Sequence, residues 1–116
     1  MHELSLCEDL LEQVEAIARA HGAERIASIT VRIGPLSGIE PMLLESAFSI
    51  GRVGTLAEEA ELRMEQQPVR VVCQSCGAES QTSASHLICA SCGSYDTKLL
   101  SGDELILASV ELLNAD

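Results

Sequence analysis

Apolar residues near the start of the chain recur every three or four positions, which is the spacing of one face of a helix. Between residues 4 and 21 this face carries Cys7, Leu10, Leu11, Val14, Ile17 and Ala18, while acidic residues occupy much of the remainder. We therefore predict an amphipathic helix over this segment. His21 and Gly22 come next, and a histidine followed by a glycine is typical of a helix C-terminus.

The remaining pattern predicts one more helix and three strands. Residues 27–33 and 60–66 alternate between apolar and polar side chains, as half-buried strands do. Pro41 is well placed in the first turn of a second helix, which we expect to end near Arg52. Residues 104–113 are mostly apolar, and we predict that they form the central or best-buried strand.

Helices and strands in this order indicate the α/β class. We expect two helices packed on a small three-stranded mixed sheet, with a four-cysteine subdomain similar to a zinc ribbon inserted before the last strand. The predicted boundaries are residues 1–68 plus 100–116 for the discontinuous α/β domain and residues 69–99 for the insert. A length of 116 residues suits one main domain.

Composition and charge exclude several classes of partner. Seven Lys and Arg against eighteen Asp and Glu give a net charge of −11, which repels nucleic acid and anionic membrane surfaces. No apolar run approaches the ~18 residues of a membrane span, and the first residues lack the basic region of a secretory leader. We expect a cytoplasmic protein, in which paired cysteines are metal ligands or redox groups rather than disulfides.

Four of the five cysteines form two Cys-x-x-Cys-Gly knuckles at residues 73–77 and 89–93. Two such pairs place four thiolates around one tetrahedral ion, and the glycines permit the tight turns. A closed thiolate set favours zinc, or an iron–sulfur centre, and leaves no position for substrate water. We predict structural zinc on Cys73, Cys76, Cys89 and Cys92. The linking residues are small and polar, so the metal must supply the folding energy of the insert.

Alternatives exist for the other candidate ligands in this region. A Cys-x-x-Cys pair also occurs in dithiol redox enzymes, although there it lies at the start of a helix beside a strand. His86 stands three residues before Cys89 and could replace a ligand, but an exposed loop histidine is the simpler expectation. Cys7 lies on the apolar helix face, where a buried small hydrophobe is expected.

The first three residues, Met1, His2 and Glu3, offer an amine, an imidazole and a carboxylate. A metal bound by the Met1 amine, the His2 amide nitrogen and His2 Nδ1 closes a five-membered and a six-membered ring in one plane. Planar nitrogen sets suit Ni(II) or Cu(II). The amine and the imidazole must lose protons to bind, so affinity should rise with pH. Taken alone, a histidine at the second position is weak evidence, and an incidental N-terminus is the simpler expectation.

Several segments taken together resemble the HypA/HybF family of hydrogenase maturation proteins. They are the starting Met-His-Glu-Leu-Ser-Leu, residues 33–40, Ala47-Phe48, residues 54–58, the two knuckles and residues 102–105. The resemblance covers nearly the whole chain, and its most specific feature is Met-His-Glu followed about seventy residues later by paired Cys-x-x-Cys motifs. Ala90 departs from the family, which often has Pro there; this loosens the second knuckle without removing a ligand.

The resemblance implies a nickel metallochaperone, and not an enzyme, that helps to insert Ni(II) into the [NiFe]-hydrogenase large subunit together with the maturation GTPase. By the family's pattern, nickel binds at Met1, His2 and Glu3, and structural zinc binds at Cys73, Cys76, Cys89 and Cys92. Residues 1–68 plus 100–116 are then the nickel-binding domain. Glu40 would add a carboxylate if it folds beside the N-terminus, although a helix start and solvation explain it equally well.

Two other classes of function stay open at this point. A zinc-ribbon interaction module without nickel transfer predicts no nickel uptake once zinc is saturated. An enzyme predicts turnover and an open metal position, but the sequence offers no nucleotide loop and no general base at a convincing spacing. The sequence also leaves open whether the protein is a homodimer.

Overall fold

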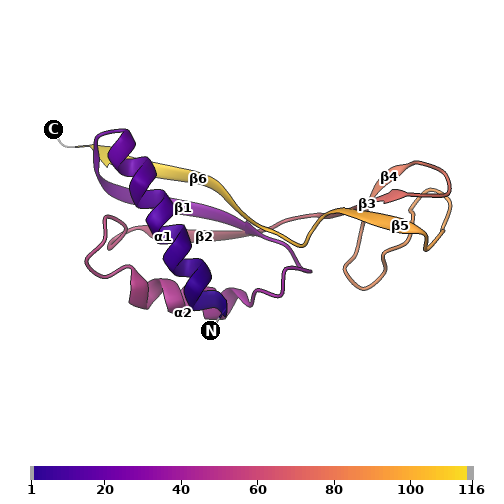
Figure 1. Cartoon of the computed structure of the whole chain (residues 1–116), viewed down its shortest axis with the longest axis horizontal. Coiled ribbons are helices and arrows are strands. Elements are labelled where there is room, and N and C mark those ends of the chain that lie inside the picture. The colour runs from indigo at the N-terminus through magenta and orange to yellow at the C-terminus, as the bar shows by residue number, and fades with distance from the viewer. Residues whose placement is uncertain (1, 115–116) are drawn as a thin grey trace. The chain divides into compact units, whose positions relative to one another are not determined.

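The computed structural model describes residues 2–114 and contains two helices and six strands in that range (Figure 1). Met1 and the side chain of His2, both predicted nickel ligands, lie outside the described part. In chain order the elements are α1 (His2–Ala20), β1 (Ala23–Ile33), α2 (Pro41–Gly51), β2 (Glu61–Gln66), β3 (Val69–Cys73), β4 (Glu79–Thr82), β5 (Thr97–Ser101) and β6 (Leu105–Asn114). The predicted α/β class is confirmed.

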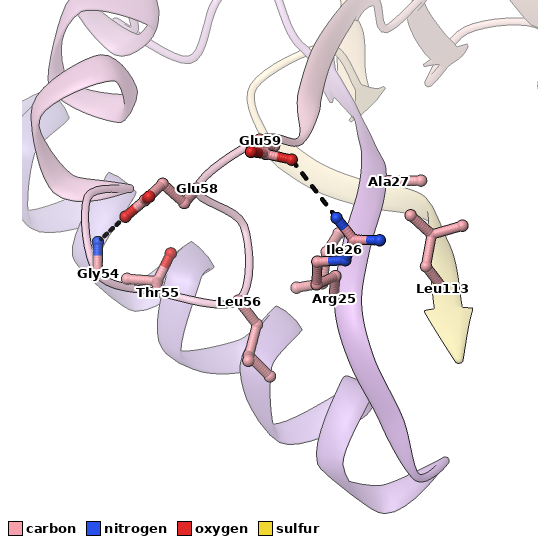
Figure 2. Close-up of a pocket in the computed structure, with 9 residues that line it drawn as sticks. All are labelled: Arg25, Ile26, Ala27, Gly54, Thr55, Leu56, Glu58, Glu59 and Leu113. Carbon is pink, nitrogen blue, oxygen red and sulfur yellow. Dashed lines mark hydrogen bonds and ion pairs between the residues drawn. The ribbon is translucent and has the colours of Figure 1, made fainter. Parts of the chain in front are cut away.

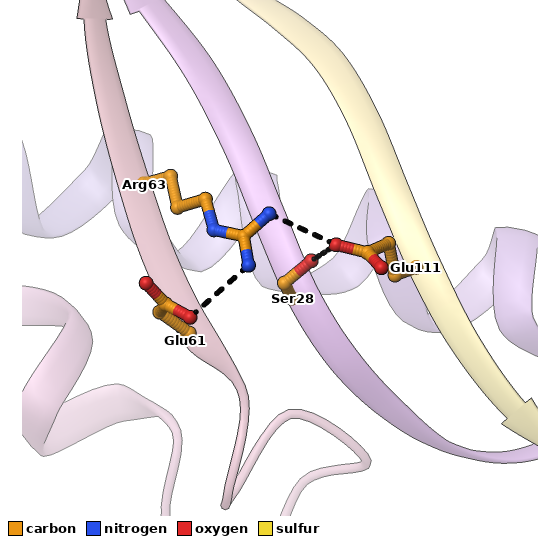
Figure 3. A network of polar contacts seen from close by, with 4 residues as sticks. All are labelled: Ser28, Glu61, Arg63 and Glu111. Atoms are coloured by element: carbon orange, nitrogen blue, oxygen red, sulfur yellow. Dashed lines mark hydrogen bonds and ion pairs between the residues drawn. The ribbon is translucent and has the colours of Figure 1, made fainter.

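The described residues divide into two compact units, each with a three-stranded sheet. The first unit comprises residues 2–31, 39–65 and 106–114, and the second comprises 32–38 and 66–105. The first sheet has the order β2-β1-β6, and Figure 3 shows β1 and β2 pointing the same way with β6 opposed. It is therefore the mixed sheet that the sequence predicts.

Both helices of the first unit bury one apolar face. On α1 the buried residues are Cys7, Leu10, Leu11, Val14 and Ala18, and on α2 they are Leu44, Ala47 and Phe48. The predicted end of the first helix is confirmed, because His21 Nδ1 lies 2.9 Å from the Ile17 carbonyl oxygen and Gly22 has a φ of +69°. The helix begins earlier than predicted, at His2, so that its first turn contains His2 and Glu3, two of the three predicted nickel ligands.

The prediction that residues 104–113 form the central, best-buried strand is wrong. β6 lies at an edge of its sheet, whereas β1 is central and completely buries Ile29 and Val31. Apolar content misleads here because β1 also buries two small polar residues, Ser28 and Thr30. Their hydroxyls reduce the apolar content of the strand that is most enclosed.

The buried Ser28 is covered by a polar network on one face of the sheet (Figure 3). Its hydroxyl donates to Glu111 Oε1 at 2.5 Å, and Arg63 donates to the same oxygen at 3.0 Å and to Glu61 at 3.2 Å. The Ser28 hydrogen bond and the Arg63 charge lower the pKa of Glu111. The network thus joins all three strands of the sheet and gives the buried hydroxyl an ionised acceptor.

The second unit is built on an antiparallel sheet of order β4-β3-β5. Val71 of the central strand pairs with Ser80 on one side and Leu99 on the other. Besides two cysteines, the buried apolar side chains of the second unit are Ile33, Val69 and Val71. So small a core contributes little hydrophobic stabilisation.

Neither helix in residues 2–114 combines the length and the apolar character that a membrane span requires.

We predict that Gly34→Ala destabilises the second unit. A Cβ atom at Gly34 would lie 2.1 Å from the Gly102 carbonyl oxygen, so the backbone would have to move. We expect the free energy of unfolding to fall by at least about 2 kcal/mol, measured by urea unfolding followed by circular dichroism.

Gly51→Ala is the matched control for this substitution. Its Cβ would meet the end of the Leu11 side chain at 3.1 Å, and alanine favours the helix by about 1 kcal/mol, so the two effects offset each other. Equal losses in the two variants would contradict the prediction.

Candidate metal centre

The four knuckle cysteines converge, as the sequence predicts. The four Sγ atoms, those of Cys73, Cys76, Cys89 and Cys92, all lie within 4.8 Å of one another. The Sγ atoms of Cys73 and Cys92 are 3.6 Å apart, and those of Cys76 and Cys89 are 3.7 Å apart. Four sulfurs at ~2.3 Å around one tetrahedral ion would be roughly 3.8 Å apart, so the cluster has the dimensions of a metal site.

The two knuckles have the same backbone geometry. In the first, the Gly77 N–H donates to the Cys73 carbonyl at 2.9 Å, and in the second the Gly93 N–H donates to the Cys89 carbonyl at 2.8 Å. The two glycines have φ values of +77° and +75°, a region that other residues rarely adopt. The glycines of the motif are therefore required by the turn that points each pair of sulfurs inward.

Backbone amides of the knuckles prepare the sulfurs to bind a cation. The Cys76 N–H donates to Cys73 Sγ at 3.4 Å, and this hydrogen bond, together with those from the Ser75 N–H and the neighbouring thiols, lowers the pKa of Cys73 to about 6. The Ser94 N–H lowers the pKa of Cys92, but hydrogen bonds with the neighbouring cysteine sulfurs, Cys73 first, raise it to about 12. The four sulfurs therefore share protons when no cation is bound, and a metal that binds them must displace these protons.

The cluster is open to solvent on one side. Cys73 and Cys89 are buried, whereas Cys76 and Cys92 are exposed. His86 is also exposed and does not belong to the group, so the four cysteines complete a tetrahedral set without it. Four sulfur ligands fill a tetrahedral coordination shell, so the site needs no further protein ligand.

The fifth cysteine lies elsewhere. Cys7 is 1 % exposed in the first unit, and burial, together with the charge of Glu8, raises the pKa of its thiol. A neutral buried thiol neither coordinates a cation nor reacts readily. The prediction that Cys7 is a small hydrophobic core residue is confirmed.

At the other candidate site, Glu3 and Glu40 lie together although 37 residues separate them. Glu3 Oε2 accepts a hydrogen bond from the Glu40 backbone N–H at 3.2 Å. Glu40 is also the N-cap of α2, because its Oε1 accepts from the Met42 N–H at 3.4 Å. The first turn of α1 therefore lies beside the start of α2. This proximity is the condition under which the sequence analysis expects Glu40 to add a carboxylate to the nickel site.

A separate pocket of about 460 Å³ is lined by residues 25–27, 54–56, Glu58, Glu59 and Leu113 (Figure 2). Its polar side chains are already partnered: Arg25 pairs with Glu59 at 3.5 Å, and the Gly54 N–H donates to Glu58 at 2.5 Å. None of its lining residues is a cysteine or a histidine. This pocket is therefore distinct from both candidate metal sites.

A family model described as "HypA: Hydrogenase/urease nickel incorporation, metallochaperone, hypA" matches residues 1–112. Curated relatives called hydrogenase maturation factor HypA include one from Nitrosospira multiformis, which is 48 % identical over 97 % of this chain and 98 % of the relative. Another, from Aquifex aeolicus, is 43 % identical over 97 % of each chain. Both relatives therefore match this chain along almost their full length.

Solved structures agree with the sequence comparisons. The solution structure of the Ni metallochaperone HypA from Helicobacter pylori is 27 % identical, with a TM-score of 0.75 over 97 % of this chain and 98 % of that one. A second solution structure of a HypA protein has a TM-score of 0.78 at 27 % identity, over 99 % and 98 % of the two chains. The fold described above is therefore shared with these two proteins.

We predict that Cys76→Ser removes the metal-binding capacity of the cluster. A neutral hydroxyl replaces an exposed thiolate, so the bound metal should fall well below one equivalent, measured by element-resolved mass spectrometry after dialysis. Cys7→Ser is the control, because it also removes one thiol but lies outside the cluster. If both variants keep, or both lose, one equivalent, the cluster does not hold the metal as described.

Proposed function

The chain belongs to the HypA family of hydrogenase and urease nickel-incorporation metallochaperones, and we propose that it carries Ni(II) at its N-terminus for assembly of the [NiFe]-hydrogenase active site. Proteins of this family are maturation factors and not catalysts. Residues 1–68 plus 100–116 are the nickel-binding domain in this proposal, and residues 69–99 hold a structural zinc. The match that begins at Met-His-Glu and continues through residue 112 carries the proposal.

The donor chemistry of the cysteine cluster supports zinc as its ion. Four thiolates at tetrahedral separations suit zinc, which has no geometric preference of its own and accepts sulfur readily. Structural zinc contributes about 10–16 kcal/mol of apparent binding energy in comparable peptides, which is large beside the burial of three aliphatic side chains. The zinc in this proposal stabilises the fold and takes no part in transfer.

The backbone at the start of α1 supports nickel binding by Met1, His2 and Glu3. The first amides of a helix have no intrahelical acceptor, so the amide nitrogen of His2 is available to lose its proton to a bound metal. Together with the Met1 amine and the His2 imidazole it completes a planar nitrogen set, which Ni(II) favours. The Glu3 carboxylate accepts a hydrogen bond from the Glu40 N–H, and in this proposal it offsets the charge of the ion.

In this proposal the zinc is held permanently by the cysteine cluster, whereas the nickel at the N-terminus can be released, as a delivery protein requires. An ion held by the first residues of the chain is accessible to an incoming ligand before the old bonds are fully broken, which lowers the barrier to transfer. The proposed recipient is the [NiFe]-hydrogenase large subunit, and the maturation GTPase acts with the chaperone. In this proposal the nickel transfer takes place in the cytoplasm, where thiols stay reduced.

We predict that His2→Ala abolishes nickel binding and leaves zinc in place. Removing a residue that only hydrogen-bonds to a metal ligand lowers metal affinity roughly 10- to 100-fold. His2→Ala removes a ligand itself, so nickel affinity should fall by more than this. Isothermal titration of zinc-loaded protein with Ni(II) measures the affinity, and the zinc content is the internal control. Unchanged affinity would remove the N-terminal assignment, and absence of nickel binding in the wild type would leave a zinc-ribbon interaction module.

We also predict that nickel affinity depends on a free, unprotonated N-terminal amine. Because α-amines ordinarily titrate near ~8 and histidines near ~6.5, affinity should rise as pH increases through this interval. An N-terminal acetyl group should weaken binding at every pH in the interval. Titrations of acetylated and unmodified protein at several pH values compare the two, and equal affinities would exclude the amine as a ligand.

A further inference from the structure

A second pocket is formed entirely by residues of the second unit. It has a volume of about 390 Å³ and is lined by Pro35, by residues 66–69 at the start of β3, and by residues 81–84 at the end of β4. None of its lining residues is a cysteine, so the pocket is distinct from the metal cluster of the same unit. Its volume is that of a site for a small ligand or for one side chain of a partner.

The walls of this pocket are uncharged. None of its lining residues is ionisable, although the chain as a whole has a net charge of −11. Three glutamines, Thr82 and Ser83 supply the polar groups, and Val69, which is 4 % exposed, supplies apolar surface. The pocket of Figure 2, by contrast, is lined by side chains of both charges. A charged ligand would lose hydration here without meeting an opposite charge, so the lining favours a neutral, polar ligand.

One polar atom at this pocket has no hydrogen-bond partner. Among the described residues, Gln67 Oε1 is a buried side-chain oxygen that accepts from no donor. The backbone of the same residue is satisfied, because the Gln67 N–H donates to the Ile33 carbonyl at 3.0 Å. A buried acceptor without a donor destabilises the folded protein, since it has lost its water and gained nothing in exchange. The free protein thus leaves one acceptor for a ligand to satisfy.

The Gln67 side chain is able to meet a ligand. Gln67 lines the pocket and is only partly buried. Because its amide oxygen has no hydrogen bond to break, a turn of the side chain toward the pocket costs little. A donor waiting in the pocket would add a hydrogen bond that the free protein lacks. This difference in free energy between the two states is what drives a ligand-induced turn.

Several groups of the wall offer acceptors without donors. Pro35 and Pro68 have no N–H, and the Thr82 hydroxyl already donates to the His86 carbonyl, so its oxygen is left to accept. The ligand must therefore supply N–H groups. A primary carboxamide is a neutral group that offers two donors and an acceptor in one plane. It is also the group best matched to a glutamine, because two amides can exchange a pair of N–H···O bonds.

We propose that this pocket binds a primary carboxamide, which donates an N–H to Gln67 Oε1. A small free amide and the side chain of an asparagine or glutamine in a peptide both bring this group. The inference does not depend on the proposed nickel-carrier function, because neither the pocket nor the ligand involves a metal. It adds a ligand site to the unit whose role in that proposal is only to hold zinc.

The test compares ligands that differ only in the carboxamide. The amide probes are propionamide and a capped tripeptide with a central asparagine. Propionate and the same tripeptide with a central aspartate are their matched acids. Each is titrated into full-length, zinc-loaded, nickel-free protein that is isotope-labelled, and the NMR signals of the Gln67 side-chain amide and of residues 81–84 are followed. Ligands this small should bind in the millimolar range. The amides should bind at least about tenfold more tightly than the acids.

The relative affinities of the two amides identify the source of the carboxamide. Tighter binding of the tripeptide assigns the pocket to a side chain of a peptide. Equal or tighter binding of propionamide assigns it to a free amide. Both results support the proposed chemistry of the ligand.

The variant Gln67→Met removes the acceptor and keeps an unbranched side chain that fills the same space. Its affinity for the amides should fall at least about tenfold. Its urea midpoint should rise, because the buried unpartnered oxygen is gone. Zinc content should not change. Gln13→Met is the matched control, since it replaces an exposed glutamine of α1 in the first unit and should alter neither amide affinity nor the urea midpoint.

Four results would overturn the proposal. They are the absence of NMR shifts with either amide at up to about 100 mM, equal affinities for amides and acids, unchanged amide affinity in Gln67→Met, and a lower urea midpoint for that variant. The last would mean that the amide oxygen has a partner in the free protein, such as an ordered water. Because no nickel is present, a failure of nickel binding would overturn the carrier function separately from this site.

Discussion

Four sulfur atoms within 4.8 Å of one another cannot all be ionised unless a cation lies among them. The second unit depends on this constraint, since its knuckles hold the sulfurs together while few apolar side chains are available to hold the knuckles. Without the cation the sulfurs share protons, as the low pKa of Cys73 and the high pKa of Cys92 indicate. Binding a metal and completing the fold are thus one event in this part of the chain.

The features that the sequence predicts well are those carried by local chemistry. Both helices follow from their apolar spacing, and the cysteine cluster follows from a motif whose residue types have few other uses in a reducing compartment. The positive φ values of Gly77 and Gly93 were likewise implied by their position after each cysteine pair. In each case the relevant information lies within a few residues.

Features that depend on distant residues do not follow from the sequence pattern. The edge position of β6 depends on which strand pairs with which, and the buried hydroxyl of Ser28 has its partner, Glu111, on another strand. No local pattern reveals either. The polar strand β4 exists because its backbone pairs with β3, and its side chains give no alternating signal. The contact between Glu3 and Glu40 joins the starts of two helices. The sequence pattern does not show that these two residues are close in space.

The unequal burial of the four cysteines gives the cluster a direction. Each knuckle contributes one enclosed sulfur and one that faces water, so a competing thiol, a chelator or an oxidant can approach only Cys76 and Cys92. The first bonds to break would then be one from each loop, while Cys73 and Cys89 still bridge the knuckles through the ion.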